Sequence, residues 1–194
     1  MNQKTLVTFL GSPRKKGHST ALTRSIAEGA KDVGFEVKEY YLNDKGIRGC
    51  QSCFYCREHE GCSVKDYLAP MYQDIRQAEA IVVASPIYYA QVTGQTKLWL
   101  DRTFPFSSGS LAEGHFGSRL PGKKVITVFS QNHGDPNAYK PAMEWLHGFF
   151  VNLYEWKILS TIAACGELEQ SSREFEALLK RAYAAGRGLA ENLD

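Results

Sequence analysis

Four cysteines stand close together in the run GCQSCFYCREHEGC. They are Cys50, Cys53, Cys56 and Cys62, and their spacing is C-x2-C-x2-C-x5-C. Thiolates at successive three-residue steps can converge on one small object, and a fourth can reach the same object after a short loop. Four thiolates around one centre are the ligands of an iron–sulfur cluster of the 4Fe-4S type. The spacing therefore predicts a cluster site at these cysteines.

Other roles for the four thiols stay open. The run differs from the bacterial ferredoxin pattern, in which the third spacer has three residues and a proline follows. It also differs from the usual zinc pattern, in which a long spacer separates two close pairs of ligands. We recognise no secretory signal, which argues against disulfides. Reduced free thiols, a zinc site and redox-active thiols remain as alternatives to a cluster.

The composition is ordinary for a soluble globular protein. The chain has 194 residues, of which 43% are hydrophobic and 23% charged, and this length suits one domain spanning residues 1–194. A formal net charge of +2, without a concentrated basic stripe, gives no reason to expect a nucleic-acid partner. No apolar stretch approaches the length of a membrane span, so we expect no membrane partner and a cytoplasmic protein.

Strand-like and helix-like segments alternate along the chain. For example, AIVVA at residues 80–84 is a β-branched run typical of a strand buried on both faces, whereas Leu22, Ile26 and Ala30 recur at helical spacing. The expected strands are Thr5–Leu10, Phe35–Leu42, Ala80–Ala84, Lys124–Phe129 and Glu155–Ala163. The expected helices are Ser19–Val33, Asp66–Ala78 with Asp66 as N-cap, Thr93–Thr103, Pro136–Phe150 and a C-terminal helix containing Phe175, Leu178, Leu179, Ala182 and Leu189. Residues 104–121 read as an irregular loop. This alternation predicts an α/β fold with a doubly wound parallel sheet.

Ligands of such sheets bind beyond the carboxyl ends of the strands, so the loops there are candidate sites. The loop after the first strand reads GSPRKKGHST and opens a helix. Free N–H groups at a helix N-terminus, hydroxyl groups and a nearby arginine together favour binding of a phosphate. The loop matches neither the Walker pattern nor G-x-G-x-x-G. An N-cap followed by a simple turn is the structural alternative.

Two further loops follow the third and fourth strands. Ser85-Pro86-Ile87-Tyr88-Tyr89 combines a rigid proline with two tyrosines that can lie against a flat ring. Ser130-Gln131-Asn132-His133-Gly134 is a polar loop that could meet the other side of the same ring. A surface turn with core tyrosines, and an ordinary polar turn, are the respective alternatives.

With these loops in view, the chain resembles the NAD(P)H-dependent FMN reductase and iron–sulfur flavoprotein group of flavodoxin-like proteins. GSPRKKGHST is similar to the group's GSPRxxGNT phosphate loop, with His18 where Asn is common. ASPIYYAQVTGQTKLWLDR is similar to its SPxYxxxxxxxxKxxxDR segment, which here carries Pro86, Tyr88, Lys97, Asp101 and Arg102. The cysteine run resembles the compact motif of the iron–sulfur flavoproteins. The likeness extends from about residue 4 to residue 103 and includes the strand at 124–129.

The resemblance implies a five-stranded flavodoxin-like sheet of order 2-1-3-4-5, with helices on both faces and FMN at the three loops. The residues expected to bind FMN are Ser12, Arg14, Lys16, Gly17, His18, Ser19, Thr20, Pro86, Ile87, Tyr88, Tyr89, Ser130, Asn132 and Gly134. It also implies a homodimer or homotetramer, for which Phe104, Phe106 and Phe116 offer a candidate contact.

The five histidines are scattered, and we find no nucleophile–base arrangement, which suits an enzyme whose cofactor carries the chemistry. The resulting prediction is an oxidoreductase that takes electrons from NAD(P)H through FMN to a small acceptor such as a quinone. The first alternative is an electron carrier that exchanges electrons with ferredoxin through a 4Fe-4S cluster. A redox sensor is a third, weaker alternative.

Overall fold

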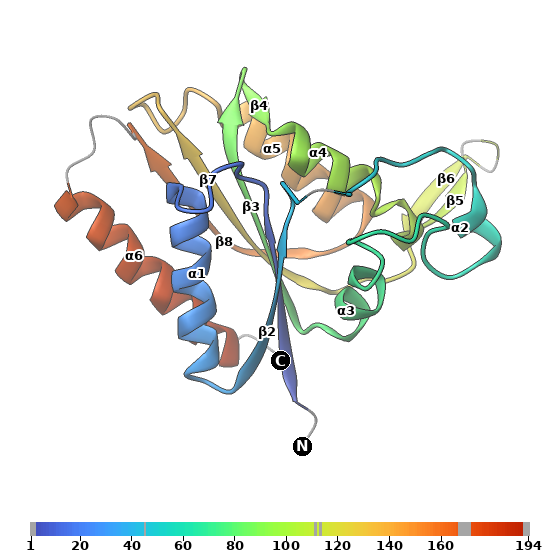
Figure 1. Ribbon diagram of the computed structural model, residues 1–194, viewed down its shortest axis with the longest axis horizontal. Helices are drawn as coiled ribbons and strands as arrows, with labels where there is room; N and C mark the ends of the chain where they lie inside the picture. The colour runs from blue at the N-terminus through green and yellow to red at the C-terminus, as the bar shows by residue number, and fades with distance from the viewer. Residues whose placement is uncertain (1–2, 45, 111, 113, 167–171, 192–194) are drawn as a thin grey trace.

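The computed structural model describes residues 3–44, 46–110, 112, 114–166 and 172–191. A central sheet of parallel strands has the order β2-β1-β3-β7-β8 (Figure 1). This order confirms the predicted doubly wound α/β topology. The strands are β1 (Lys4–Leu10), β2 (Phe35–Tyr41), β3 (Ala80–Tyr88), β7 (Lys124–Gln131) and β8 (Lys157–Cys165).

Helices cover both faces of this sheet. On one face lie α1 (His18–Lys31) and α6 (Ser172–Arg187), and on the other lie α3 (Met71–Gln77), α4 (Gly94–Asp101) and α5 (Lys140–Gly148) (Figure 1). Each face has its own hydrophobic core. Within the described ranges, no helix is long and apolar enough to cross a membrane.

The side chains of β3 alternate between the two cores. Ala80, Val82 and Ala84 face α1 and α6, whereas Ile81 and Val83 face the other helices. All five are at most 1% exposed, which explains why this strand is an unbroken apolar run.

Two glycines allow α1 and α6 to approach closely. A Cβ at Gly29 would lie 2.1 Å from the carbonyl oxygen of Tyr183, and a Cβ at Gly186 would lie 2.0 Å from that of Ile26. The Ser25 hydroxyl donates a hydrogen bond across the same contact to the Leu179 carbonyl, at 2.8 Å. The two helices therefore pack backbone against backbone.

The prediction of an irregular loop at 104–121 is wrong. After the short 3-10 helix η1 (Phe104–Phe106), the strands β5 (Ser107–Ser110) and β6 (His115–Ser118) pair as an antiparallel hairpin beside the main sheet (Figure 1). These strands consist mainly of Ser, Gly and His, so they lack the apolar alternation by which strands are recognised. Phe106 is fully buried and is therefore not the surface contact expected of it, whereas Phe116 is 39% exposed.

Several predicted boundaries also shift. Helix α3 begins at Met71, after Pro70. The predicted N-cap Asp66 lies upstream in a turn, where its carboxylate accepts a hydrogen bond from the Leu68 N–H at 3.0 Å and binds an arginine described below. Strand β3 continues through Pro86 to Tyr88 and pairs with β4 (Gln91–Val92). Helix α5 begins only at Lys140 and ends in the π-helical turn η2 (Phe149–Leu153). The remaining short elements are α2 (Tyr55–Glu58) and η3 (Gly188–Ala190).

Candidate functional site

A cavity of about 270 Å³ lies at the carboxyl ends of β1, β3 and β7. The three loops predicted to meet there do contribute to one cavity, as expected for the ligand crevice of a doubly wound sheet. Its lining residues are Ser12, Arg14, Gly17, His18, Pro86, Ile87, Tyr88, Ser130, Gln131 and Asn132.

The segment between β1 and α1 is folded by its own hydrogen bonds. The Gly11 N–H donates to the Ala84 carbonyl at 2.8 Å, which ties the loop to the end of β3. The Arg14 N–H donates to the Ser12 hydroxyl at 3.1 Å, and the Gly17 N–H donates to the Arg14 carbonyl at 3.1 Å. The loop thus turns back on itself before α1 begins, and Arg14 lines the cavity.

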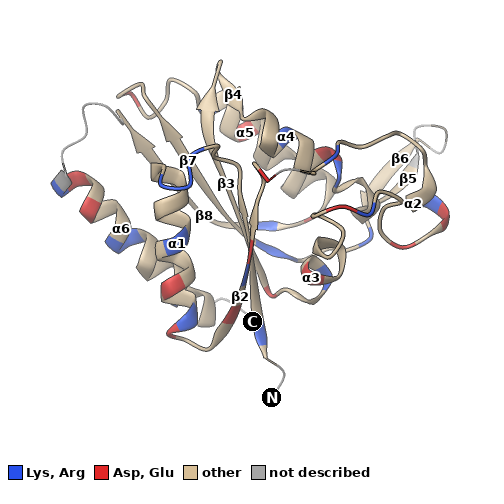
Figure 2. Ribbon diagram, in the orientation of Figure 1, with Lys and Arg blue, Asp and Glu red and all other residues tan. Residues whose placement is uncertain are grey.

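The N-terminus of α1 is suited to an anion. Gly17 is its N-cap and has no side chain with which to cap the first N–H groups. The Arg14 guanidinium adds a positive charge beside this helix end, and Figure 2 shows the basic loop Arg14–Lys16 at the start of α1. Free N–H groups, a helix dipole and an arginine are the features that bind phosphate.

A buried polar atom adds to the case for a bound ligand. The Gln131 Oε1 atom, in the cavity lining, has no hydrogen-bond partner among the described residues. The Nε2 atom of Gln131 is held by the carbonyls of His133 and Asp135, at 3.0 and 2.7 Å, so its Oε1 atom is left as an acceptor. Buried polar groups are costly when unpaired, so a polar ligand is expected nearby. These features fit a phosphate ester joined to a flat ring with polar edges.

Five of the predicted residues do not line the cavity. Lys16 and Gly134 are exposed, and Tyr89 lies fully exposed in the turn of the β3–β4 hairpin. Ser19 and Thr20 are buried within the start of α1. Gln131 also lines the cavity, as the last residue of β7; it belongs to the predicted loop at 130–134 but was not among the residues expected to bind FMN.

His18 links the cavity to the C-terminal helix. Its ring lies 4.3 Å from that of Phe175 of α6 in an edge-to-face arrangement. The His18 imidazole thus lines the cavity while Phe175 of α6 packs against it.

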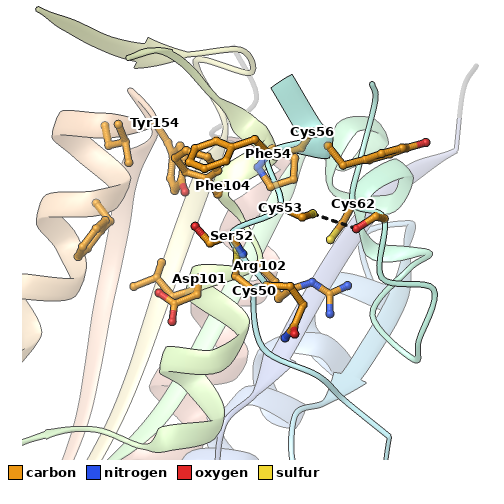
Figure 3. Close-up of a pocket in the computed structure, with 17 residues that line it drawn as sticks. Cys50, Ser52, Cys53, Phe54, Cys56, Cys62, Asp101, Arg102, Phe104 and Tyr154 are labelled. Carbon is orange, nitrogen blue, oxygen red and sulfur yellow. Dashed lines mark hydrogen bonds between the residues drawn. The ribbon is translucent and has the colours of Figure 1, made fainter. Parts of the chain in front are cut away.

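The four cysteines Cys50, Cys53, Cys56 and Cys62 line a second cavity, of about 380 Å³ (Figure 3). Hydrogen bonds from the Ser63 hydroxyl and the Tyr55 N–H lower the pKa of the Cys53 thiol. Burial raises the pKa of Cys56, and the neighbouring thiolates of Cys62 and Cys50 raise it further.

Within the described ranges, no three His, Cys, Asp or Glu side chains are placed so that they could hold a metal ion. The four thiols nevertheless line one cavity, and cysteine thiolates are the ligand type of a 4Fe-4S cluster.

Arg102 holds the base of the cysteine segment. Its guanidinium, 1% exposed, donates to the carbonyls of Arg48 and Val64, at 2.7 and 3.2 Å. It also forms an ion pair with the buried carboxylate of Asp66, with Nη1–Oδ2 at 2.8 Å. The Arg48 N–H donates to the same carboxylate at 2.9 Å. Arg102 therefore joins both ends of the segment that carries the cysteines.

The charges of this pair are stabilised by each other. Burial of the Asp66 carboxyl raises its pKa, but the hydrogen bonds from Arg102 and Arg48 outweigh burial and lower the pKa below its usual value. For Arg102, burial lowers the pKa and the hydrogen bonds with Asp66 and Tyr72 raise it more. Both groups remain charged at neutral pH. The sequence pattern contained Arg102 and Asp66 but did not reveal their pairing.

The fold and the crevice at the carboxyl ends of the strands define a flavodoxin-like protein. The chain matches the family model of the NADPH-dependent FMN reductases over residues 5–159. It therefore belongs to this family of oxidoreductases, as the sequence motifs predicted.

Solved structures share the fold at low sequence identity. An NAD(P)H:quinone oxidoreductase from Methanothermobacter marburgensis superposes with a TM-score of 0.73 at 17% identity, covering 97% of this chain and 100% of the other. An FMN-dependent NADH-azoreductase from Bacillus anthracis, solved in complex with FMN, gives a TM-score of 0.69 at 13% identity, covering 97% and 100%.

Relatives similar in sequence carry the name iron–sulfur flavoprotein. One from Archaeoglobus fulgidus is 30% identical over 114 residues, which are 59% of this chain and 52% of that protein. Another, from Methanocaldococcus jannaschii, is 28% identical over 146 residues, 75% of this chain and 71% of that protein. The match thus spans only about half the length of the first of these relatives.

Proposed function

We propose that the protein binds FMN in the cavity at the ends of β1, β3 and β7 and oxidises NAD(P)H to reduce a small acceptor. The observation that carries this proposal is the convergence of the uncapped helix α1, Arg14 and the segments at Pro86–Tyr88 and Ser130–Asn132 on one cavity. Membership of the FMN reductase family supports it. The chemistry that bound FMN would supply is acceptance of a hydride from the nicotinamide and transfer of two electrons to the acceptor.

The residues of the chain would bind and orient the cofactor. The N–H groups at the start of α1, with Arg14, would hold its phosphate. Pro86, Ile87 and Tyr88 would support the ring, and Gln131 would accept a hydrogen bond through its Oε1 atom. Lys16, Ser19, Thr20, Tyr89 and Gly134 stay predictions, because they do not line the cavity of this single chain.

Anaerobic titration with NADPH and with NADH tests the function. We expect either nucleotide to bleach the flavin absorbance of the purified protein, and the more effective one would be the physiological donor. A flavin that stays oxidised with both nucleotides would contradict the proposal.

Replacing Arg14 by Ala is expected to weaken FMN binding by about 1.5–3 kcal/mol, or roughly 10- to 150-fold, because a charge-assisted hydrogen bond is lost. The measurement is fluorescence titration of the flavin-free protein with FMN. Lys31→Ala, at the other end of α1, removes the same charge from an exposed pair with Glu28 and serves as control. Equal affinities for the two variants would show that Arg14 does not bind the phosphate.

A second candidate function is electron transfer through a 4Fe-4S cluster, with a ferredoxin as partner. Two observations favour it: the four thiols line one cavity, and relatives are named iron–sulfur flavoproteins. Cys50, Cys53, Cys56 and Cys62 would hold the cluster as thiolates. We also propose a homodimer or homotetramer, which light scattering on the purified protein would detect.

Replacing Cys53 by Ser is expected to abolish iron retention while FMN remains bound, since the thiols line a cavity separate from that of the flavin. Iron and flavin are measured on the same anaerobically purified sample. Cys165→Ser is the matched control, because Cys165 lies at the end of β8. Unchanged iron in Cys53→Ser would rule out this ligand set.

A further inference from the structure

Two side chains from outside the proposed FMN cavity hold the loop between β1 and α1. The Tyr41 hydroxyl, at the end of β2, donates a hydrogen bond to the Pro13 carbonyl at 2.8 Å. The Arg24 guanidinium, on α1, donates through Nη1 to the Lys15 carbonyl at 3.1 Å. Pro13 and Lys15 are the neighbours of Arg14 in the sequence. The residue that brings a positive charge to the cavity is therefore anchored on both sides.

Tyr41 is itself held by contacts that involve no ligand. Its backbone N–H donates to the Tyr67 hydroxyl at 3.2 Å, and the Lys15 ammonium lies 5.4 Å from the centre of its ring. Tyr67 follows directly after Asp66, whose buried carboxylate is paired with Arg102. The hydroxyl group that binds the Pro13 carbonyl thus belongs to a framework built from several parts of the fold.

Arg24 is fixed by Glu39 of β2. The Nε and Nη2 atoms of Arg24 donate to the two carboxylate oxygens at 3.2 and 2.9 Å, and Nη1 remains for the loop. This two-point pairing is the geometry in which an arginine binds a carboxylate best. The pairing also compensates the negative charge of Glu39, which would otherwise repel an anion bound at the loop.

Three consecutive carbonyl groups of the loop, those of residues 13–15, accept hydrogen bonds. The Arg14 carbonyl accepts from the Thr20 hydroxyl at 3.2 Å as well as from the Gly17 N–H. Carbonyl oxygens repel a phosphate, whereas backbone N–H groups and a guanidinium attract it. The donors to the two flanking carbonyls lie outside the cavity lining, so these oxygens are bound away from the ligand. The loop is therefore held in a conformation that suits an anion.

We propose that Tyr41 and Arg24 are positioning residues for the phosphate of the flavin, through which the protein prefers FMN to unphosphorylated riboflavin. Neither residue lines the cavity, so both act through the loop that carries Arg14. A loop without these anchors would have to be ordered when the ligand binds, and such ordering lowers affinity. The loss would fall on the phosphate, because other segments would support the ring. This inference rests on the proposed FMN site and adds two residues to it.

Fluorescence titration of the flavin-free, full-length protein with FMN and with riboflavin tests the inference. Tyr41→Phe removes one hydroxyl group and keeps the ring beside the Lys15 ammonium. We expect FMN binding to weaken about 3- to 10-fold, as for the loss of one hydrogen bond, and riboflavin binding to stay unchanged. Tyr183→Phe is the matched control, because it removes a tyrosine hydroxyl that is bonded to Asp32 at the other end of α1.

Arg24→Ala provides a second variant that leaves the core intact, because the Arg24 side chain is about half exposed. It removes the anchor of the Lys15 carbonyl and leaves Glu39 unpaired, so FMN binding should weaken at least as much as in Tyr41→Phe. Riboflavin binding should again stay unchanged.

The ratio of the FMN and riboflavin affinities decides the outcome. A wild-type ratio in either variant, or an equal loss of affinity for both flavins, would overturn the inference. If that happens while the wild-type protein still prefers FMN, the proposed FMN site stands. A wild-type protein that binds FMN no more tightly than riboflavin would overturn the proposed phosphate site and the inference together.

Discussion

Replacing Arg102 by Gln is expected to lower the free energy of unfolding by about 3–5 kcal/mol. The side chain of Arg102 is fully buried, and that of its partner Asp66 is only 6% exposed. The variant would leave this carboxylate without its cation, and the carbonyls of Arg48 and Val64 would lose their donors. Urea unfolding at neutral pH, followed by circular dichroism, measures the loss.

A matched control lies on the same helix. Lys97→Gln also removes one cation from α4, but its ion pair with Asp101 is about half exposed on both sides. Exposed pairs spaced by four residues contribute about 0.3–0.5 kcal/mol, so this variant should be close to the wild type. Similar losses of unfolding free energy in the two variants would show that burial does not make the Arg102–Asp66 pair more important for stability than an exposed pair.

The pH dependence of the Arg102→Gln effect follows from the Asp66 carboxyl. In the wild type its folded pKa is lowered, so its contribution to stability is present above the unfolded pKa and is lost as pH falls through the folded value. In the variant, the hydrogen bonds from Arg102 no longer oppose burial, so the folded pKa of Asp66 rises. Protonation of the carboxyl then removes the cost of burying an unpaired charge. The stability difference should therefore be largest at neutral pH and shrink below about pH 4. A difference that does not change with pH would contradict the buried-charge explanation.

Replacing Gly29 by Ala is the second large effect, with an expected loss of about 3 kcal/mol, the upper end of ordinary overpacking. Alanine normally stabilises a helix relative to glycine by up to about 1 kcal/mol. Here the new Cβ would lie 2.1 Å from the Tyr183 carbonyl oxygen and 3.1 Å from the Arg187 nitrogen. Backbone atoms cannot rotate away as a side chain can, so α1 and α6 must separate.

Thermal unfolding of Gly29→Ala beside Gly94→Ala checks this prediction. Gly94 begins α4, and a Cβ there would meet no atom within 4 Å in the described part of the chain. Gly94→Ala should therefore match or slightly exceed the wild-type stability, whereas Gly29→Ala should fall below it. A Gly29→Ala variant as stable as the wild type would mean that the two helices can move apart at little cost.

The main sheet and the three loops at its edge were predictable because local patterns determine them. β3 is buried on both faces, so its sequence is continuously apolar, and Pro86 and Tyr88 follow directly along the strand. Parallel topology then brings the ends of β1, β3 and β7 together without any knowledge of side-chain contacts. The predicted residues on these three segments therefore line one cavity.

The features that were missed depend on contacts that the pattern of apolar and polar residues does not record. Arg102 binds Asp66 and Arg48, which lie 36 and 54 positions away, and no local pattern records such a pairing. The β5–β6 hairpin depends on backbone hydrogen bonds between polar residues. The amide of Gln131, at the end of β7, is held by the carbonyls of His133 and Asp135, and the sequence does not show these hydrogen bonds.

The cysteine segment is closed at its base, so its length has little effect on the stability of the sheet. Arg102 joins the carbonyls of Arg48 and Val64, so the intervening residues form a loop whose ends are fixed by the scaffold. The entropic cost of closing a loop rises slowly, by about 0.6 kcal/mol for each doubling of its length. The loop could therefore be lengthened or shortened at small cost to the fold. The cysteine segment is in this sense an exchangeable module on a constant flavodoxin-like frame.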